Sequence, residues 1–146
     1  MATYFVGGTE IQLFDGSVKK IEDVIIGDVL LSVDEFGNRT SITVDYTNEV
    51  SFDKDDVKIL TLSTGRDIVT HVDSKIVIIG KGKRYVWELE EGDICIDFNG
   101  TQCTVVDVTP VDEEHGLFEG QSCGLFTIEF EGIDTDYYSE TILVSI

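Results

Sequence analysis

The chain has 146 residues, of which 42% are hydrophobic, with one proline and a formal net charge of −19. These values fit one domain over 1–146 and exclude a disordered chain. The longest apolar stretches span about five residues, too few for a membrane span, and so negative a charge argues against free nucleic acid as a direct partner because phosphate is repelled.

Strand-forming segments dominate the sequence. In chain order, 29–33 and 42–44 flank a Gly- and Asn-containing turn and predict a hairpin. Further segments rich in Val, Ile, Thr and Phe and bounded by turn residues are 58–62, 76–80, 103–108 and 125–132. Helical turns are expected only over 18–24, with Ser17 as its cap, and over 85–90. The pattern predicts an all-β domain.

An internal repeat relates the two halves of the chain. The segment 21–46 resembles 86–108, and the Gly-Asp pair at 27–28 falls on the pair at 92–93. Glycine permits a positive φ at a tight turn, and the Asp side chain can bond nearby backbone amides. Two unrelated hairpins with the same turn chemistry remain the alternative interpretation.

The three cysteines, Cys95, Cys103 and Cys123, contain no Cys-x-x-Cys pair that would indicate zinc. A two-residue turn at 99–100 would place Cys95 opposite Thr104 rather than opposite Cys103. The two thiols would then lie on opposite faces of the hairpin, which argues against a disulfide. We therefore expect buried, inert thiols in a reducing compartment.

The remaining candidate residues favour structural roles. His71 lies in an apolar strand and is expected to be a hydrogen-bonded structural side chain. His115 follows three carboxylates in a loop predicted over 111–124, but a mobile loop preorganises a metal site poorly. We expect Trp87, the only tryptophan, to pack within the second repeat. No metal and no cofactor are expected.

The opening segment, 5–38, resembles the start of Hint domains, the fold shared by inteins, hedgehog autoprocessing domains and bacterial intein-like modules. The motifs that carry the resemblance are Gly8-Thr9-Glu10-Ile11, Asp15-Gly16-Ser17, Lys20-Ile21-Glu22-Asp23 and Gly27-Asp28. The segment 127–146 is similar to the closing strand pair of the family. The resemblance implies an all-β horseshoe of many short strands with a pseudo-twofold internal duplication.

The resemblance also indicates where the reactive residues of the family would stand. In the family, a Cys or Ser at the first position attacks the preceding carbonyl; that position falls on Tyr4, whose phenol is protonated at neutral pH. A terminal His-Asn pair releases the downstream segment; its positions fall on Ser145 and Ile146.

The third reactive element of the family is Thr-x-x-His, which polarises the scissile amide. Its Thr position falls on His71 and its His position on Ser74. A register one residue earlier recovers Thr70 but places Asp73 at the His position. In either register the imidazole needed for proton transfer near neutral pH is missing.

These substitutions predict no catalytic residues and an inactive scaffold that serves as a structural or protein-interaction module. The expected partner is a protein, with no nucleic acid and no membrane. Analogy with inteins in viral genes suggests a capsid, tail or baseplate component of a phage, located in the cytoplasm or in a virion, with no signal peptide. Two alternatives are an atypical autoprocessing domain, with Cys123 as a displaced nucleophile, and a remnant or engineered splicing domain.

Overall fold

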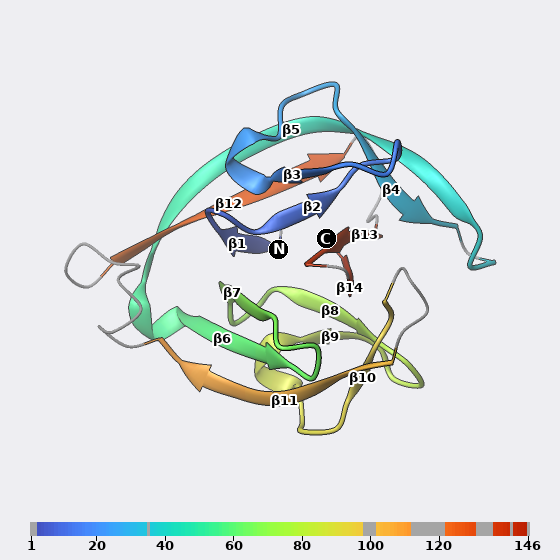
Figure 1. The fold of residues 1–146 in the computed structure, drawn as a ribbon. Helices are drawn as coiled ribbons and strands as arrows, with labels where there is room; N and C mark the ends of the chain where they lie inside the picture. The colour runs from blue at the N-terminus through green and yellow to red at the C-terminus, as the bar shows by residue number, and fades with distance from the viewer. Residues whose placement is uncertain are drawn as a thin grey trace.

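The computed structural model describes residues 3–34, 36–97, 102–111, 122–130, 136–140 and 142–145. This part of the chain is built from β-strands and short 3₁₀-helices (Figure 1). The strands are β1 (Tyr4–Val6), β2 (Glu10–Gln12), β3 (Val18–Lys20), β4 (Val29–Val33), β5 (Arg39–Asp53), β6 (Val57–Leu62), β7 (Asp67–His71), β8 (Lys75–Ile78), β9 (Gly82–Tyr85), β10 (Ile94–Cys95), β11 (Cys103–Pro110), β12 (Ser122–Phe130), β13 (Asp136–Ser139) and β14 (Ile142–Ser145). The 3₁₀-helices are η1 (Ile21–Asp23), η2 (Lys54–Asp56) and η3 (Val86–Glu88). The predicted all-β class is confirmed, and none of the described helices is long enough to cross a membrane.

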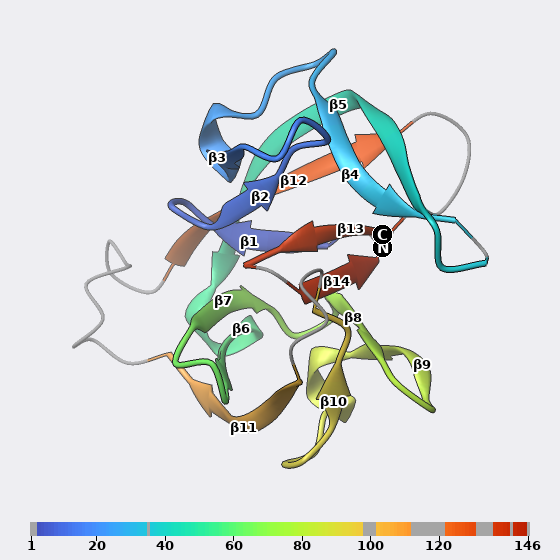
Figure 2. The same cartoon turned by 45° about the vertical axis from the view of Figure 1, so that its right-hand side comes forward.

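The strands form two lobes joined by continuous pairing. The pairing order is β3-β2-β13-β14-β8-β10-β11-β6-β7-β1-β12-β5-β4, and within the described part of the chain β9 pairs with β8 alone. The longest strand, β5, pairs with β4 along its first part and with β12 along the rest. Figures 1 and 2 show β5 curving over the horseshoe from one lobe to the other, with the β13–β14 hairpin between the lobes and the two chain ends close together.

The internal duplication predicted from the sequence is present in the backbone hydrogen bonds. The amide of Ile21 donates to the carbonyl of Thr9, and the amide of Val86 donates to that of Ser74, so donor and acceptor both move by 65 positions (74 − 9 and 86 − 21). The same offset relates other backbone hydrogen bonds, written here as donor residue to acceptor residue: 14→29 corresponds to 79→94, 16→13 to 81→78, and 24→21 to 89→86. Thr9 and Ser74 therefore occupy equivalent positions in the two halves.

The two Gly-Asp turns explain why this motif recurs. Gly27 and Gly92 have φ angles of 96° and 92°, which a side chain would strain. The carboxylates of Asp28 and Asp93 each accept the amide three positions earlier, at 3.0 and 2.9 Å. Each turn thus directs the chain from a 3₁₀-helix into the next strand.

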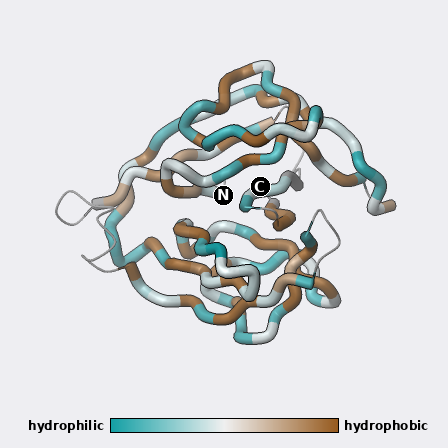
Figure 3. The backbone as a smooth tube through the Cα atoms, in the orientation of Figure 1, coloured by the Kyte–Doolittle hydropathy of each residue, from teal (hydrophilic) through white to brown (hydrophobic). Residues whose placement is uncertain are grey.

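The hydrophobic core is shared between the halves. Alternating apolar residues along the strands, visible as brown bands in Figure 3, are buried between the sheets. The main cluster combines Ile11 and Leu30 of the first half with Ile76 and Ile78 of the second and Val144 of β14. A second cluster, which includes Val57, Ile59, Val69, Cys123 and Leu125, lies under the start of β1.

The predicted helical turn over 18–24 is partly wrong. Residues Val18–Lys20 form β3, and only Ile21–Asp23 form a 3₁₀-helix, whose preceding residue makes no side-chain cap. Ser17 instead donates its hydroxyl hydrogen to Asp15 at 2.5 Å. Pairing of β3 with β2 overrides the local helical preference.

The predicted arrangement of Cys95 and Cys103 is also wrong. The two residues are directly opposite each other in the β10–β11 ladder, and Ile94 is opposite Thr104. A shift of one residue in register moves side chains to the other face, so the thiols lie on the same face. All three cysteines are buried and free, as the prediction of inert thiols requires.

Two further expectations concern Trp87 and the segment 111–124. Trp87 is 62% exposed, so the expectation that it packs within the second repeat is wrong. Strand β12 begins at Ser122, inside the predicted loop. Residues 112–121, which include His115, lie outside the described part of the chain.

Candidate functional site

The first strand places Tyr4 in the middle of the domain. β1 is inserted between β7 and β12, with Phe5 opposite both Thr70 and Phe126 and with Tyr4 opposite Thr127. Phe5 is fully buried in the main core cluster and fixes the strand in this position. The backbone of residues 3 and 4 therefore runs through the interior, beside the end of β7 and the start of β8.

The peptide bond between Thr3 and Tyr4 is held at both of its polar ends by hydroxyl groups. The amide nitrogen of Tyr4 donates to Oγ of Ser74 at 3.0 Å. The carbonyl oxygen of Thr3 accepts from Oγ1 of Thr127 at 2.9 Å. Ser74, which is one of the two residues to which the resemblance assigns the imidazole, thus adjoins the peptide bond that precedes Tyr4.

The next carbonyl, that of Tyr4, is held in the same way. It accepts from Oγ1 of Thr70 at 2.5 Å and from Oγ of Ser74 at 3.2 Å. The side chains of Thr3, Thr70, Ser74 and Thr127, which we call the hydroxyl cluster, are all at most 2% exposed. Buried backbone groups are stabilised when they are paired in this manner.

The phenol of Tyr4 belongs to a separate aromatic contact. Its ring lies 4.9 Å from that of Phe52 in an edge-to-face arrangement and borders the second core cluster. Burial, reinforced by the negative charge of Glu129 and by Tyr46, raises the pKa of Tyr4 above its ordinary value. The phenol is therefore neutral over the physiological range and is not an activated nucleophile.

His71 is hydrogen-bonded within the domain, as was expected from the sequence. Its Nδ1 accepts the amide of Asp73 at 3.0 Å, and its ring lies 4.4 Å from that of Phe52. Burial lowers the pKa of His71, although the carboxylates of Asp73 and Asp56 oppose this shift. The neutral imidazole is thus engaged by the turn between β7 and β8.

The two ends of the domain meet beside Lys75. Its amide donates to Oγ1 of Thr3 at 3.2 Å, and Lys75 is also the ladder partner of Ser145 in β14. The side chain of Ser145 and all of Ile146 lie outside the described residues. Strand β8 therefore contacts both Thr3, which precedes Tyr4, and the backbone of Ser145, one of the two terminal positions of the resemblance.

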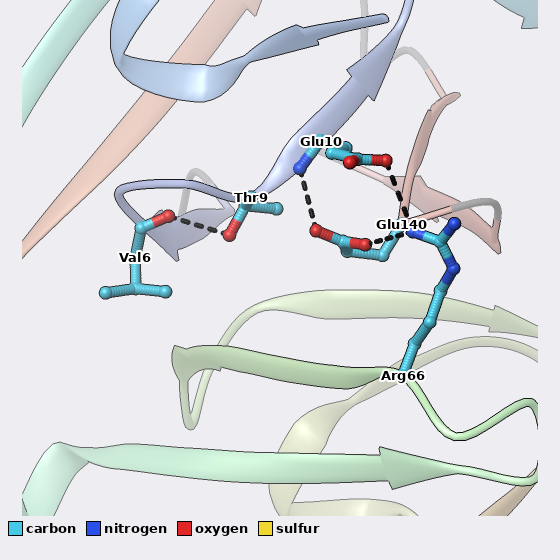
Figure 4. Close-up of polar contacts among 5 residues, drawn as sticks. All are labelled: Val6, Thr9, Glu10, Arg66 and Glu140. Carbon is cyan, nitrogen blue, oxygen red and sulfur yellow. Dashed lines mark hydrogen bonds and ion pairs between the residues drawn. The ribbon is translucent and has the colours of Figure 1, made fainter. Parts of the chain in front are cut away.

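An ion-pair cluster holds the β13–β14 hairpin against the first half. Nη1 of Arg66 lies 2.6 Å from Oε2 of Glu140 and 3.3 Å from Oε2 of Glu10, and the amide of Glu10 donates to Oε1 of Glu140 at 2.8 Å (Figure 4). In the adjoining turn, Oγ1 of Thr9 donates to the carbonyl of Val6 at 2.7 Å. Glu140 has a φ of 47°, and these contacts fix the turn that precedes β14.

The described residues contain no group of three or more His, Cys, Asp or Glu side chains that could hold a metal ion.

Thr3 and Thr127 could not be singled out from the sequence, because a threonine in a strand is ordinarily explained by its preference for β-structure. The bond between these two residues joins positions 124 apart, so no local pattern indicates it.

No protein-family model matches the chain, and no curated protein matches it in sequence. Solved structures do match: a bacterial intein-like domain from Clostridium thermocellum has a TM-score of 0.81 at 20% identity, covering 98% of both chains.

This protein has the Hint fold. A DnaB intein from Synechocystis also matches, with a TM-score of 0.76 at 17% identity, over 98% of this chain and 97% of that one. The gp41-1 intein matches with a TM-score of 0.74 at 18% identity, over 99% and 98%. The intein-like architecture expected from the sequence motifs is therefore confirmed along nearly the whole chain.

Proposed function

We propose that this Hint domain performs no autoprocessing and serves as a protein-interaction module. The observation that supports the proposal is the hydroxyl cluster around the Thr3–Tyr4 peptide bond. The resemblance assigns the family's imidazole to Ser74 or, one residue earlier, to Asp73. Ser74 is the one that contacts this peptide bond, and a serine hydroxyl cannot exchange protons near neutral pH. The cluster can orient and stabilise this peptide bond, but it contains no base that would activate an attacking group.

The side chain of Tyr4 supports the same conclusion. Its phenol is kept protonated, and its ring packs against Phe52. A large ring that fills a hydrophobic position contributes to stability, and stabilising replacements at former reactive positions commonly sacrifice activity. The only described imidazole, His71, bonds to the amide of Asp73 instead.

Intact mass spectrometry tests the absence of autoprocessing. A short leader peptide is fused before residue 1, and the mass is followed for days at several pH values, with and without added thiol. We expect no change of mass. Loss of the leader at a site next to Tyr4 would overturn the proposal.

A matched variant shows that the assay can detect cleavage. Tyr4→Cys combined with Ser74→His restores a thiol and an imidazole at the positions that flank the Thr3–Tyr4 bond. Thiol-dependent loss of the leader from this variant, but not from the natural sequence, is the expected pair of results.

Residual cleavage is the alternative function, because one contact favours it. The hydroxyl of Thr127 donates to the carbonyl oxygen of Thr3, which is the arrangement that polarises a carbonyl for attack. If cleavage occurs, Thr127→Val should abolish it. If the mass is unchanged in the natural sequence, the contact of Thr127 is structural.

The interaction role is tested by association. Native mass spectrometry and affinity capture with the full chain should yield a defined protein partner. Co-sedimentation with virus particles tests the more specific proposal of a virion component. A protein that stays monomeric and retains nothing would contradict the interaction role while leaving the absence of autoprocessing intact.

A further inference from the structure

We propose that an exposed apolar surface at the first Gly-Asp turn binds a segment of a protein partner in which apolar side chains alternate with lysine or arginine. The inference rests on the proposed interaction role and names the chemistry of the partner. The surface is formed by Phe14, Ile25, Ile26 and Val29, and we call it the apolar turn patch.

The four side chains of the apolar turn patch are large and face solvent. Phe14 is 52% exposed and Val29 is 41% exposed, and the values for Ile25 and Ile26 are 61% and 64%. The two isoleucines are the most exposed of the described Val, Leu and Ile side chains. Single exposed apolar side chains are ordinary on a protein surface, whereas a contiguous group of them marks an interaction site.

Backbone hydrogen bonds bring the four residues together. The amide of Phe14 donates to the carbonyl of Val29 at 3.0 Å. The carboxylate of Asp28 accepts the amide of Ile25 at 3.0 Å, and the amide of Asp28 donates to the carbonyl of Ile25 at 3.1 Å. This turn carries both isoleucines and leads directly into Val29. A hollow of about 410 Å³ adjoins the turn and is lined by Leu13, Phe14, Asp15, Gly27, Asp28 and Val29.

The second half of the chain shows that the fold does not require the two isoleucines. At the offset of 65 positions, Ile25 and Ile26 correspond to Glu90 and Glu91. The second turn closes through the same bonds, because the carboxylate of Asp93 accepts the amide of Glu90 at 2.9 Å and its amide donates to the carbonyl of Glu90 at 3.1 Å. Charged, solvated side chains are therefore sufficient for this turn, and a role in binding accounts for the isoleucines.

The other two positions of the patch are apolar in both halves. Phe14 corresponds to Ile79, and Val29 corresponds to Ile94. An apolar residue at these positions is thus common to the two copies of the turn. The pair of isoleucines is what distinguishes the first copy, so substitutions at that pair test the inference most directly.

Carboxylates surround the apolar turn patch. Asp15 lines the hollow, and Asp23 precedes the turn in the sequence. Asp45 follows Val44, whose carbonyl accepts the amide of Gly27 at 2.9 Å. The three aspartates are exposed, and none of them forms an ion pair with another described residue.

The two lysines nearby do not cancel this acidic rim. Nζ of Lys19 lies 2.8 Å from Oδ2 of Asp28, so its charge is already paired. Lys20 is the next residue of β3 and therefore points to the opposite face, where its ladder partner is Glu10. The segment 13–29 contains four carboxylates and two lysines, which leaves a net charge of −2.

The charge decides which occupant fits the patch. A second copy of the chain would bring another net charge of −19 and a second acidic rim against the first. An anionic membrane surface would be repelled for the same reason. A partner segment whose apolar side chains cover the isoleucines and whose cations face the aspartates gives an apolar centre with a complementary charged rim.

The test uses the full chain and the fluorescently labelled peptide Lys-Leu-Lys-Phe-Lys. One control peptide, Lys-Ala-Lys-Ala-Lys, keeps the charge, and another, Glu-Leu-Glu-Phe-Glu, keeps the apolar side chains. Anisotropy of the label should show saturable binding of the first peptide that weakens as salt is added. We expect binding of the Ala peptide to be weaker by about tenfold and the Glu peptide not to bind, because both features are needed.

A pair of double variants locates the apolar contact. Ile25→Glu with Ile26→Glu copies the second turn into the first and should weaken binding by about tenfold or more. If charge alone attracted the basic peptide, the same variant would strengthen binding instead. Ile79→Glu with Val106→Glu removes two apolar side chains that are 55% and 44% exposed in the second half, with the same change of charge, and should leave the affinity nearly unchanged.

A second pair of variants tests the rim. Asp23→Asn with Asp45→Asn should weaken binding by about threefold and flatten its dependence on salt, since rim charges act mainly in this way. Asp55→Asn with Asp67→Asn makes the same change of net charge at exposed positions elsewhere and should have little effect. Circular dichroism checks that every variant is folded.

Photo-crosslinking locates the site without any substitution in the protein. A benzophenone group replaces the ring of Phe in the peptide, and mass spectrometry identifies the attached residues. Crosslinks should fall within residues 14–29. Crosslinks elsewhere in the chain would overturn the inference.

Four further outcomes would also overturn it. These are equal binding of the Ala peptide, binding of the Glu peptide, equal loss in the variants of the two turns, and self-association that Ile25→Glu with Ile26→Glu abolishes. The last would assign the patch to a second copy of the chain. A partner that is captured equally well by this variant would leave the proposed interaction role intact and contradict the patch alone, so the two proposals fail separately.

Discussion

Oγ of Ser74 lies 3.0 Å from the amide nitrogen of Tyr4 and 3.2 Å from the carbonyl oxygen of the same residue. One hydroxyl therefore accepts from the peptide unit that precedes Tyr4 and donates to the unit that follows it. Both bonds are partly buried, since Ser74 is 0% exposed and Tyr4 is half-buried. The serine thus fixes the first strand to the start of β8.

This relationship predicts the cost of removing the hydroxyl. Ser74→Ala leaves the amide of Tyr4 without its acceptor in the interior, which should lower the free energy of unfolding by about 1–3 kcal/mol. Ser63→Ala is the control, because its hydroxyl accepts the amide of Thr104 at an exposed position. Urea denaturation of both variants gives the comparison, and equal effects would contradict the role assigned to Ser74.

His71 predicts a dependence of stability on pH. Its pKa is lowered by burial, so the folded state binds the proton less readily than the unfolded state. The contribution of neutral His71 to the free energy of unfolding is complete above the ordinary pKa of about 6.5. It is lost as the pH falls below that value toward the lowered pKa of the folded state. Chemical denaturation between about pH 5 and pH 8 should show this decline.

Two variants isolate the histidine responsible. His71→Gln keeps an acceptor for the amide of Asp73 but removes the titrating group, so the decline in stability toward low pH should become shallower. His115→Gln, which removes the other histidine, is the comparison. A steep decline that survives in His71→Gln would assign the effect to carboxylates.

The cysteines predict slow alkylation of the native protein. Burial, with smaller contributions from Cys103 and Asp93, raises the pKa of Cys95 to about 12, and burial also raises the pKa values of Cys103 and Cys123. At about pH 8 almost no thiolate is present to react. Iodoacetamide should leave the folded chain unmodified and label all three thiols in denaturant.

A surface cysteine provides the matched control for that experiment. Ser63→Cys places a thiol at an exposed position and should react rapidly under the same conditions.

The raised pKa of Cys95 also makes stability depend on pH, because it favours the folded state while the thiol stays protonated. The contribution of Cys95 to the free energy of unfolding is complete below the ordinary thiol pKa of 9.0 and is lost as the pH rises toward about 12.

The two Gly-Asp turns predict unequal effects of the same substitution. The carboxylate of Asp93 accepts the amide of Glu90, and its side chain is 6% exposed, against 18% for Asp28. Asp93→Ala should lower the free energy of unfolding by about 1–2 kcal/mol because the part-buried amide of Glu90 loses its acceptor. Asp28→Ala should cost less. Thermal denaturation at low and high salt separates this bond from the ion pairs with Lys81 and Lys19.

Much of the fold could be predicted because its signals are local. Runs of β-branched residues mark β6, β8, β11 and β12, and the Gly-Asp pairs mark equivalent turns because only glycine adopts their φ without strain. The register of Cys95 and Cys103 could not be predicted, because it depends on the turn between them. A shift of one residue there reverses the face of every side chain.

The candidate site was only partly visible in the sequence. The spacing of the motif pointed to Tyr4 and Ser74. Thr127 contacts Thr3 although 124 positions separate them in the sequence, so no spacing pointed to this contact. The exposure of Trp87 was missed because a lone tryptophan is usually buried to a large degree.

Strand β5 has a consequence for how the domain comes apart. Its fifteen residues run without interruption from the partner β4 to the partner β12. Because β4 and β12 are both held by this one strand, melting of β5 removes hydrogen bonds from both of them. We therefore expect these three strands to denature together, and a proteolytic cut within β5 to release β4 and β12 at once.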